Sequence, residues 1–180
     1  MKRKNQSTAG RALQLTMSGV MSGLGVILLY LGSVFEVLDI TLAALASFIV
    51  VFFVIEFSKL QALALFIVTG ILALLILPNK FPAVMYLVFI GYYPILKAIA
   101  ETKLKKVFSY TFKIITFNAA LFLLIFLARK FFRTPENVFA LETVFVALAN
   151  LTFIVYDFAL TRLISLYFFK LRSKLKIKKR

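Results

Sequence analysis

The sequence contains no cysteine and no histidine, and each absence removes a class of chemistry. Without cysteine the chain has no disulfides, no thiolate nucleophile and no thiolate-bound metal. Without histidine it lacks the commonest general base and the commonest ligand of transition metals. Acidic residues are also few, with 7 Asp and Glu against 22 Lys and Arg. We therefore expect no metal site and no cofactor.

The usual motifs of enzymes are missing as well. The sequence shows no Walker lysine loop, no zinc-ligand spacing, no nucleophile elbow and no paired-carboxylate motif. We therefore expect a protein that is not an enzyme. The net charge of +15 could suggest nucleic acid. The basic residues instead cluster at the ends of apolar runs, as membrane topology requires, so no nucleic-acid partner is expected.

What the sequence has in excess is apolar residues. They make up 62% of the chain, and the mean hydropathy is +0.98, whereas soluble domains are about 45–50% apolar. The bilayer is therefore the expected solvent and the expected partner. The first apolar run could pass for a signal peptide, but no convincing cleavage site follows it, and we expect a retained span. We expect one transmembrane domain over residues 1–180, with basic cytoplasmic segments at 1–14 and 170–180.

Six apolar runs are long enough to be membrane spans. A helix needs about 20 apolar residues to cross about 30 Å of hydrocarbon. No strand-like alternation of polarity occurs, so we expect an all-α bundle of six transmembrane helices. The runs cover residues 15–34, 40–55, 60–77, 82–100, 107–128 and 141–169.

The distribution of Lys and Arg predicts the orientation of these spans. With the N-terminus inside, 17 basic residues lie on the side of the two termini and 4 on the other side, with Arg162 left inside the last run. This bias favours two cytoplasmic termini and an even number of spans. The expected location is a cell membrane, most simply the bacterial cytoplasmic membrane.

Two ionisable residues, Asp157 and Arg162, interrupt the last apolar run. Arg162 is long enough to snorkel to the cytoplasmic headgroups. Asp157 is too short to do so, and a carboxylate at that depth costs about 3 kcal/mol unless it is paired, wetted or protonated. Asp157 should therefore face the bundle or a polar cavity, as a structural or coupling residue.

Other polar residues of the last two runs could form a seam with Asp157. Asn150 lies two helical turns before Asp157 on the same face, and Asn118 lies in the middle of the fifth run. Thr116 and Thr152 belong to the same seam. Two interpretations stay open: hydrogen bonds that hold the helices together, or part of a site for a solute or proton. Asn118 and Asn150 are candidate solute ligands.

The fourth run contains features that should bend it and carry charge. Pro94 cannot donate a backbone hydrogen bond, so the helix should bend there, and Gly91 permits a close neighbour at the bend. Lys97 and Glu101 are four residues apart and can form an ion pair. The alternative is that the bend brings Lys97 to Asp157 or Glu56.

The link between the first two spans is short and carries only two charges, Glu36 and Asp39. Asp39 can cap the second helix. The functional alternative is a gate that packs over an outward-facing pocket.

Small residues recur four apart in the first span, as Ser18 with Ser22 and Gly19 with Gly23. Such pairs let another helix approach closely. They could pack within the bundle or dock a partner helix.

The predicted architecture resembles the S component of an energy-coupling factor (ECF) transporter. The shared features are six spans in 180 residues, cytoplasmic termini, small residues in the first helix and a short apolar outer link. In that family an alanine-x-x-x-alanine pattern on the first helix docks the coupling protein; here Ser18 with Ser22, or Gly19 with Gly23, takes its place. The resemblance implies binding of a vitamin or other micronutrient near Glu36 and Asp39. It also implies association with a transmembrane coupling protein and two ATPases.

Two other functions must be weighed. Small six-span scaffolds of the cell-shape machinery, such as the rod-shape protein D family, have a similar size and hydrophobicity. A proton-coupled carrier would need paired intramembrane acids or an inverted repeat, and the two halves show no clear repeat. The transporter hypothesis predicts a cavity lined by the later helices and roofed by the first link, whereas a scaffold predicts a bundle that is packed throughout.

Overall fold

The computed structural model describes residues 8–132 and 139–171, and within these ranges it contains helices and turns but no strand. The described part includes six helical segments that are long and apolar enough to cross a membrane, as the sequence predicts. The protein is therefore a multi-pass helical membrane protein. The segments are Ala12–Val34, Asp39–Glu56, Lys59–Ile76, Phe81–Lys103, Lys106–Leu127 and Val144–Phe169.

The chain divides into two compact units between Thr102 and Lys103, and each is described by itself. The expectation of one domain therefore stays a prediction. Residues 1–7 and 172–180, which hold most of the two predicted basic cytoplasmic segments, lie outside the described residues. The orientation of the termini also stays a prediction.

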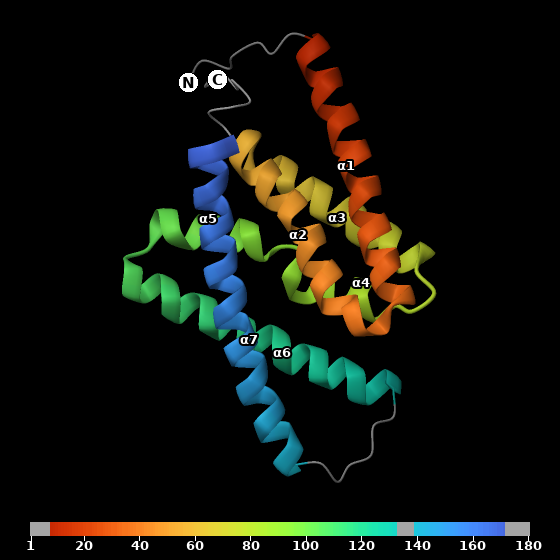
Figure 1. The fold of residues 1–180 in the computed structure, drawn as a ribbon, viewed down its shortest axis with the longest axis vertical. Helices are drawn as coiled ribbons and strands as arrows, with labels where there is room; N and C mark the ends of the chain where they lie inside the picture. The colour runs from red at the N-terminus through yellow and green to blue at the C-terminus, as the bar shows by residue number, and fades with distance from the viewer. Residues whose placement is uncertain (1–7, 133–138, 172–180) are drawn as a thin grey trace. The chain divides into compact units, whose positions relative to one another are not determined.

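In the first unit, α1 packs on α2 and α3, which also contact each other (Figure 1). α1 comes close to α3 at Gly25, where an added Cβ atom would lie 2.9 Å from Cγ2 of Thr69. A glycine is needed here because the β-branched side chain of Thr69 fills the space that a side chain would take. The helices are α1 (Thr8–Val34), a 3₁₀ turn (Glu36–Leu38), α2 (Asp39–Glu56) and α3 (Lys59–Ile76).

The fourth span is broken, as Pro94 predicts. It consists of α4 (Phe81–Met85), a π-helix (Tyr86–Ile90) and α5 (Tyr93–Lys103). The N–H of Gly91 donates to the carbonyl of Tyr86, five residues back, at 2.8 Å. Pro94 then lies in the first turn of α5, where a missing N–H costs nothing. An added Cβ atom at Gly91 would lie 2.7 Å from the rings of Phe66 and Tyr86, so the predicted close neighbours are present.

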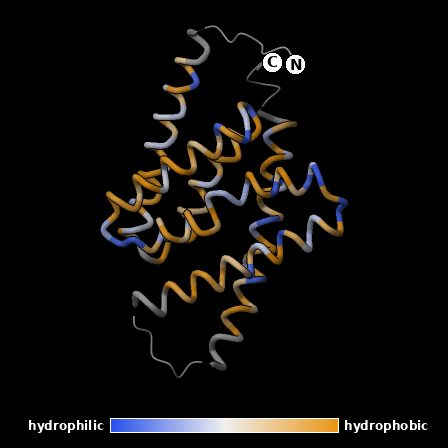
Figure 2. Tube along the Cα trace, turned by 180° about the vertical axis from the view of Figure 1, so that it is seen from behind, coloured by the Kyte–Doolittle hydropathy of each residue, from blue (hydrophilic) through white to orange (hydrophobic). Residues whose placement is uncertain are grey.

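The second unit consists of α6 (Lys106–Phe132), α7 (Phe139–Leu166) and a terminal π-helix (Tyr167–Leu171). Most apolar side chains of both long helices are exposed, as expected for surfaces that face lipid. Figure 2 shows hydrophobic residues along the spans and hydrophilic residues gathered at turns such as the one between α5 and α6. This pattern matches apolar spans joined by polar turns.

Candidate functional site

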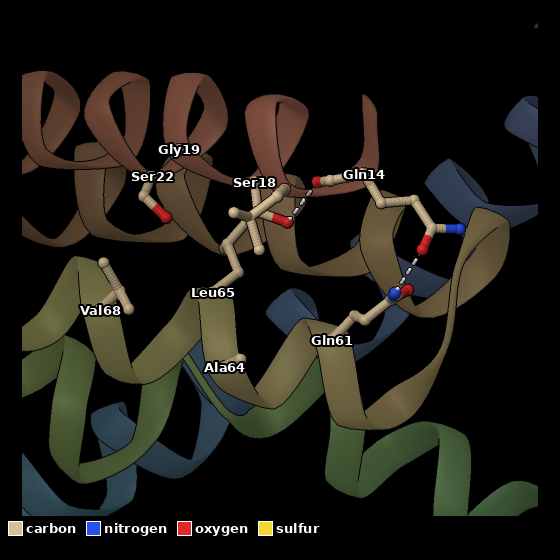
Figure 3. Close-up of a pocket in the computed structure, with 9 residues that line it drawn as sticks. Gln14, Ser18, Gly19, Ser22, Gln61, Ala64, Leu65 and Val68 are labelled. Atoms are coloured by element: carbon tan, nitrogen blue, oxygen red, sulfur yellow. Dashed lines mark hydrogen bonds between the residues drawn. The ribbon is translucent and has the colours of Figure 1, made fainter. Parts of the chain in front are cut away.

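A pocket of about 580 Å³ lies in the first unit, between the N-terminal halves of α1 and α3 (Figure 3). Its volume falls within the roughly 300–1,000 Å³ that small-molecule sites occupy. Apolar and small side chains form most of its wall, and a few uncharged polar groups point into it. Its lining residues are Gln14, Leu15, Ser18, Gly19, Ser22, Gln61, Ala64, Leu65 and Val68.

A pair of glutamines joins the two helices at one end of this pocket. The Nε2 of Gln61 donates to Oε1 of Gln14 at 2.9 Å. Gln61 is held in place because Ser58 caps α3, its hydroxyl accepting from the N–H of Gln61 at 3.2 Å. The hydroxyl of Ser18 donates to the backbone carbonyl of Gln14 at 2.9 Å. The amide pair leaves further donor and acceptor positions for a bound molecule.

Ser22 differs from most hydroxyl residues of the spans. A Ser or Thr in an apolar helix usually donates to the carbonyl four residues back. Ser22 is only 3% exposed, yet its hydroxyl has no hydrogen-bond partner among the described residues and points into the space between the helices. Residues that make the usual bond are Thr16, Ser18, Thr102, Thr111, Thr116, Thr152, Thr161 and Ser165.

The structure separates the small residues that the sequence grouped together on α1. Ser18, Gly19 and Ser22 line the pocket, whereas Gly23 does not. Nothing lies within 4 Å of a Cβ atom added at Gly19 or Gly23. The two glycines therefore do not serve close helix packing within the described part of the chain, which was one of the two alternatives. Docking of a partner helix stays a prediction.

A second group of polar residues joins α6 to α7 in the second unit. The Nζ of Lys113 lies 3.2 Å from Oδ2 and 3.4 Å from Oδ1 of Asp157, and the two side chains are 3% and 12% exposed. Lys113 also lies over the ring of Tyr110, 4.8 Å from its centroid. Asp157 therefore faces the bundle, as the sequence predicts, and its structural or coupling role stays a prediction.

Asn118 and Asn150 exchange two hydrogen bonds, 2.9 and 3.1 Å long. The remaining donor of each amide goes to a carbonyl of its own helix. Beside them the rings of Phe117 and Phe153 stack with centroids 4.4 Å apart. The amide pair therefore links the helices, and its four N–H donors are all used. A solute-binding role for Asn118 and Asn150 stays a prediction.

Replacing Asn118 by leucine should lower the free energy of unfolding by about 1–2 kcal/mol, because two interhelical hydrogen bonds are lost. The matched control is Thr116→Val, since the hydroxyl of Thr116 donates only to its own helix, at the carbonyl of Phe112. That control should change stability by less than about 0.5 kcal/mol. Unfolding in mixed micelles measures both. Equal losses in the two variants would contradict an interhelical role for the amide pair.

Lys97 and Glu101 form the predicted ion pair, with Nζ and Oε1 3.0 Å apart. The side chain of Lys97 is almost fully buried, while that of Glu101 is half-exposed. Nearby, Lys59 donates to the carbonyl of Ala98 at 3.2 Å and to the hydroxyl of Thr102 at 3.3 Å. These contacts tie the start of α3 to the end of the fourth span.

The remaining predicted residues lie at helix ends or on the surface. The side chain of Glu36 lies outside the described part of the structure. The prediction that Asp39 caps α2 is wrong. The N-cap is Leu38, because a 3₁₀ turn runs directly into the helix. Asp39 instead accepts from the N–H of Ile40. Arg162 is exposed and lies over the ring of Phe158, 5.0 Å from its centroid.

Three residues at these sites were not singled out for a site by sequence reasoning. Lys113 was considered only as one of the basic residues that predict the orientation of the spans. The fifth and sixth spans are antiparallel, so a contact between Asn118 and Asn150 places Lys113 close to Asp157. Gln14 and Gln61 stand at equivalent depths near the starts of the first and third spans. Odd-numbered spans cross the membrane in the same direction, so these two amides lie near the same side of the membrane. Their matching positions in the two spans were the sequence signal for a contact between them.

No protein-family model, no curated protein and no solved structure matches the chain.

Proposed function

We propose that this multi-pass membrane protein binds a small solute within the bilayer, as the substrate-binding subunit of an uptake transporter similar to the ECF S components. The observation that carries the proposal is the α1–α3 pocket. It combines a ligand-sized volume with apolar walls and a few convergent polar groups, the usual composition of a small-molecule site. The subunit would hydrolyse no ATP and would depend on a coupling protein and two ATPases.

The pocket lies at a different place from the cavity that the resemblance implies. It is built by the first and third spans and lies in the half of α1 away from the link at Glu36 and Asp39. In the proposed topology this is the cytoplasmic half, where a solute would leave the subunit. An outer cavity under the first link stays part of the proposal.

Docking on the coupling protein is assigned to the open side of α1. The space around Gly23 is empty of side chains within 4 Å, so a partner helix could approach the backbone there. Because Gly23 does not line the pocket and Gly19 does, the same substitution at these two positions separates solute binding from docking.

Native mass spectrometry of the tagged protein, extracted from its own membranes in mild detergent, tests this proposal. The wild type should carry a small molecule and co-purify with a coupling protein and ATPase subunits. Gly19→Leu should lose the small molecule and keep the partners, whereas Gly23→Leu should lose the partners and keep the small molecule. A wild type with neither small molecule nor partners would overturn the transporter proposal.

A scaffold is the second candidate function, and the α6–α7 contacts favour it. The amide N–H groups of Asn118 and Asn150 all donate to each other or to carbonyls of their own helices. Such bonds hold two helices together, as expected for a rigid bundle. In the same experiment a scaffold would retain protein partners but no small molecule, and Gly19→Leu would change nothing.

A further inference from the structure

We infer that the α1–α3 pocket selects an uncharged, amphipathic molecule: an apolar body with a hydrogen-bonding group at each end. This inference rests on the proposed function and specifies the class of solute. It follows from which side chains line the pocket and from which of their polar groups are already bonded.

Among the residues whose side chains the structure describes, the lining contains no charged side chain. Its polar members are two amides and two hydroxyls, from Gln14, Gln61, Ser18 and Ser22. A charged ligand would therefore find no opposite charge among the described lining residues, and burying an unpaired charge strongly disfavours its binding. An uncharged ligand meets no such penalty.

The polar groups lie at two places along the pocket, which sets the position of the ligand's own polar groups. At one end, the bonded pair of Gln14 and Gln61 offers amide donors and acceptors. Two helical turns further along α1, the hydroxyl of Ser22 points into the pocket without a partner among the described residues (Figure 3). Between them Leu65 and its apolar neighbours form the wall. A ligand with one polar group at each end would satisfy both places.

The absence of cysteine makes this testable with one introduced thiol. Ser22→Cys places a thiol of nearly the same size where the hydroxyl points into the pocket. The probes are neutral methyl methanethiosulfonate and its cationic trimethylammonioethyl and anionic sulfonatoethyl analogues, applied to the full chain in lipid nanodiscs. Thr69→Cys is the matched control, because Thr69 is equally buried, its hydroxyl is also unpartnered in the described residues, and it does not line the pocket.

Ser22→Cys should react with the neutral reagent at a rate that saturates with concentration, at least about tenfold faster than with either charged reagent. Adding Gly19→Leu, which fills the pocket, should abolish this reaction. Adding Gly23→Leu should leave it unchanged, and Thr69→Cys should stay unreactive.

Three results would overturn the inference. The first is equal reaction rates with charged and neutral reagents. The second is a rate that rises linearly with reagent concentration and is unchanged by Gly19→Leu. The third is a Ser22→Cys variant that is as unreactive as Thr69→Cys. None of them depends on partner subunits, so they are distinct from failure of the co-purification experiment. Conversely, a charged molecule identified by mass spectrometry would overturn the uncharged class and leave the proposed function standing.

Discussion

Replacing Lys113 by methionine should lower the free energy of unfolding by about 3–5 kcal/mol, because it removes the cation that lies 3.2 Å from the buried carboxylate of Asp157. Asp157→Leu should have an effect of similar size, since it leaves the buried ammonium of Lys113 without that carboxylate. Methionine and leucine keep the apolar contacts, so the losses report mainly on charge. Unfolding in mixed micelles, followed by circular dichroism, provides the measurement.

The double variant Lys113→Met with Asp157→Leu is the decisive comparison. Removing both charges should restore most of the loss, leaving the protein within about 1 kcal/mol of the wild type, because apolar replacement of a buried ion pair is often neutral. The exchanged pair, Lys113→Asp with Asp157→Lys, should be more stable than either single charge removal. Losses that simply add in the double variant would show that the two side chains act independently.

Replacing Gly25 by leucine should destabilise the first unit by about 1–3 kcal/mol or more, because the new side chain meets Thr69 of α3. The β-branched threonine has little freedom to move aside. Gly23→Leu, on the same helix two residues away, meets nothing within 4 Å and should change stability by less than about 0.5 kcal/mol. The same micelle unfolding assay compares the two variants.

A smaller change at the same contact shows whether the methyl group of Thr69 is responsible. Gly25→Ala adds only the Cβ atom that would lie 2.9 Å from Cγ2 of Thr69. Combining it with Thr69→Ser, which removes Cγ2, should recover most of the lost stability. If Thr69→Ser gave no recovery, the close approach at Gly25 would not be what limits the size of this residue.

The spans could be predicted from the sequence because each depends on local composition. A run of about 20 apolar residues has few alternatives to a membrane helix. The break in the fourth span was equally local, since Pro94 removes a backbone donor whatever surrounds it. Contact between Asn118 and Asn150 was also within reach, because polar groups inside a bilayer must find partners.

The pocket could not be predicted in the same way. Gly19, Gly23 and Gly25 all stand in one short stretch of α1, yet only Gly25 among them lies against a close neighbour in the described structure. Which glycine touches another helix depends on the rotation and crossing point of α1 on α3, and these follow from packing over the whole unit. The pocket beside Ser22 depends on the same crossing geometry of α1 and α3.

The partner of Asp157 was obscured for a different reason. A lysine near the start of a span can equally well mark the cytoplasmic boundary, and Lys113 was counted there. The structure instead buries it on the face of α6 that meets α7. Distinguishing these roles required the facing register of the two helices, which no single residue encodes.

The distance along the chain between Lys113 and Asp157 has a consequence for how the protein is made. The two residues are 44 positions apart, so Lys113 leaves the ribosome before Asp157 does. A lone ammonium in hydrocarbon is costly. The contact with Asp157 therefore lowers the cost of holding α6 in the bilayer once α7 has entered, which favours joint release of the two segments from the insertion machinery.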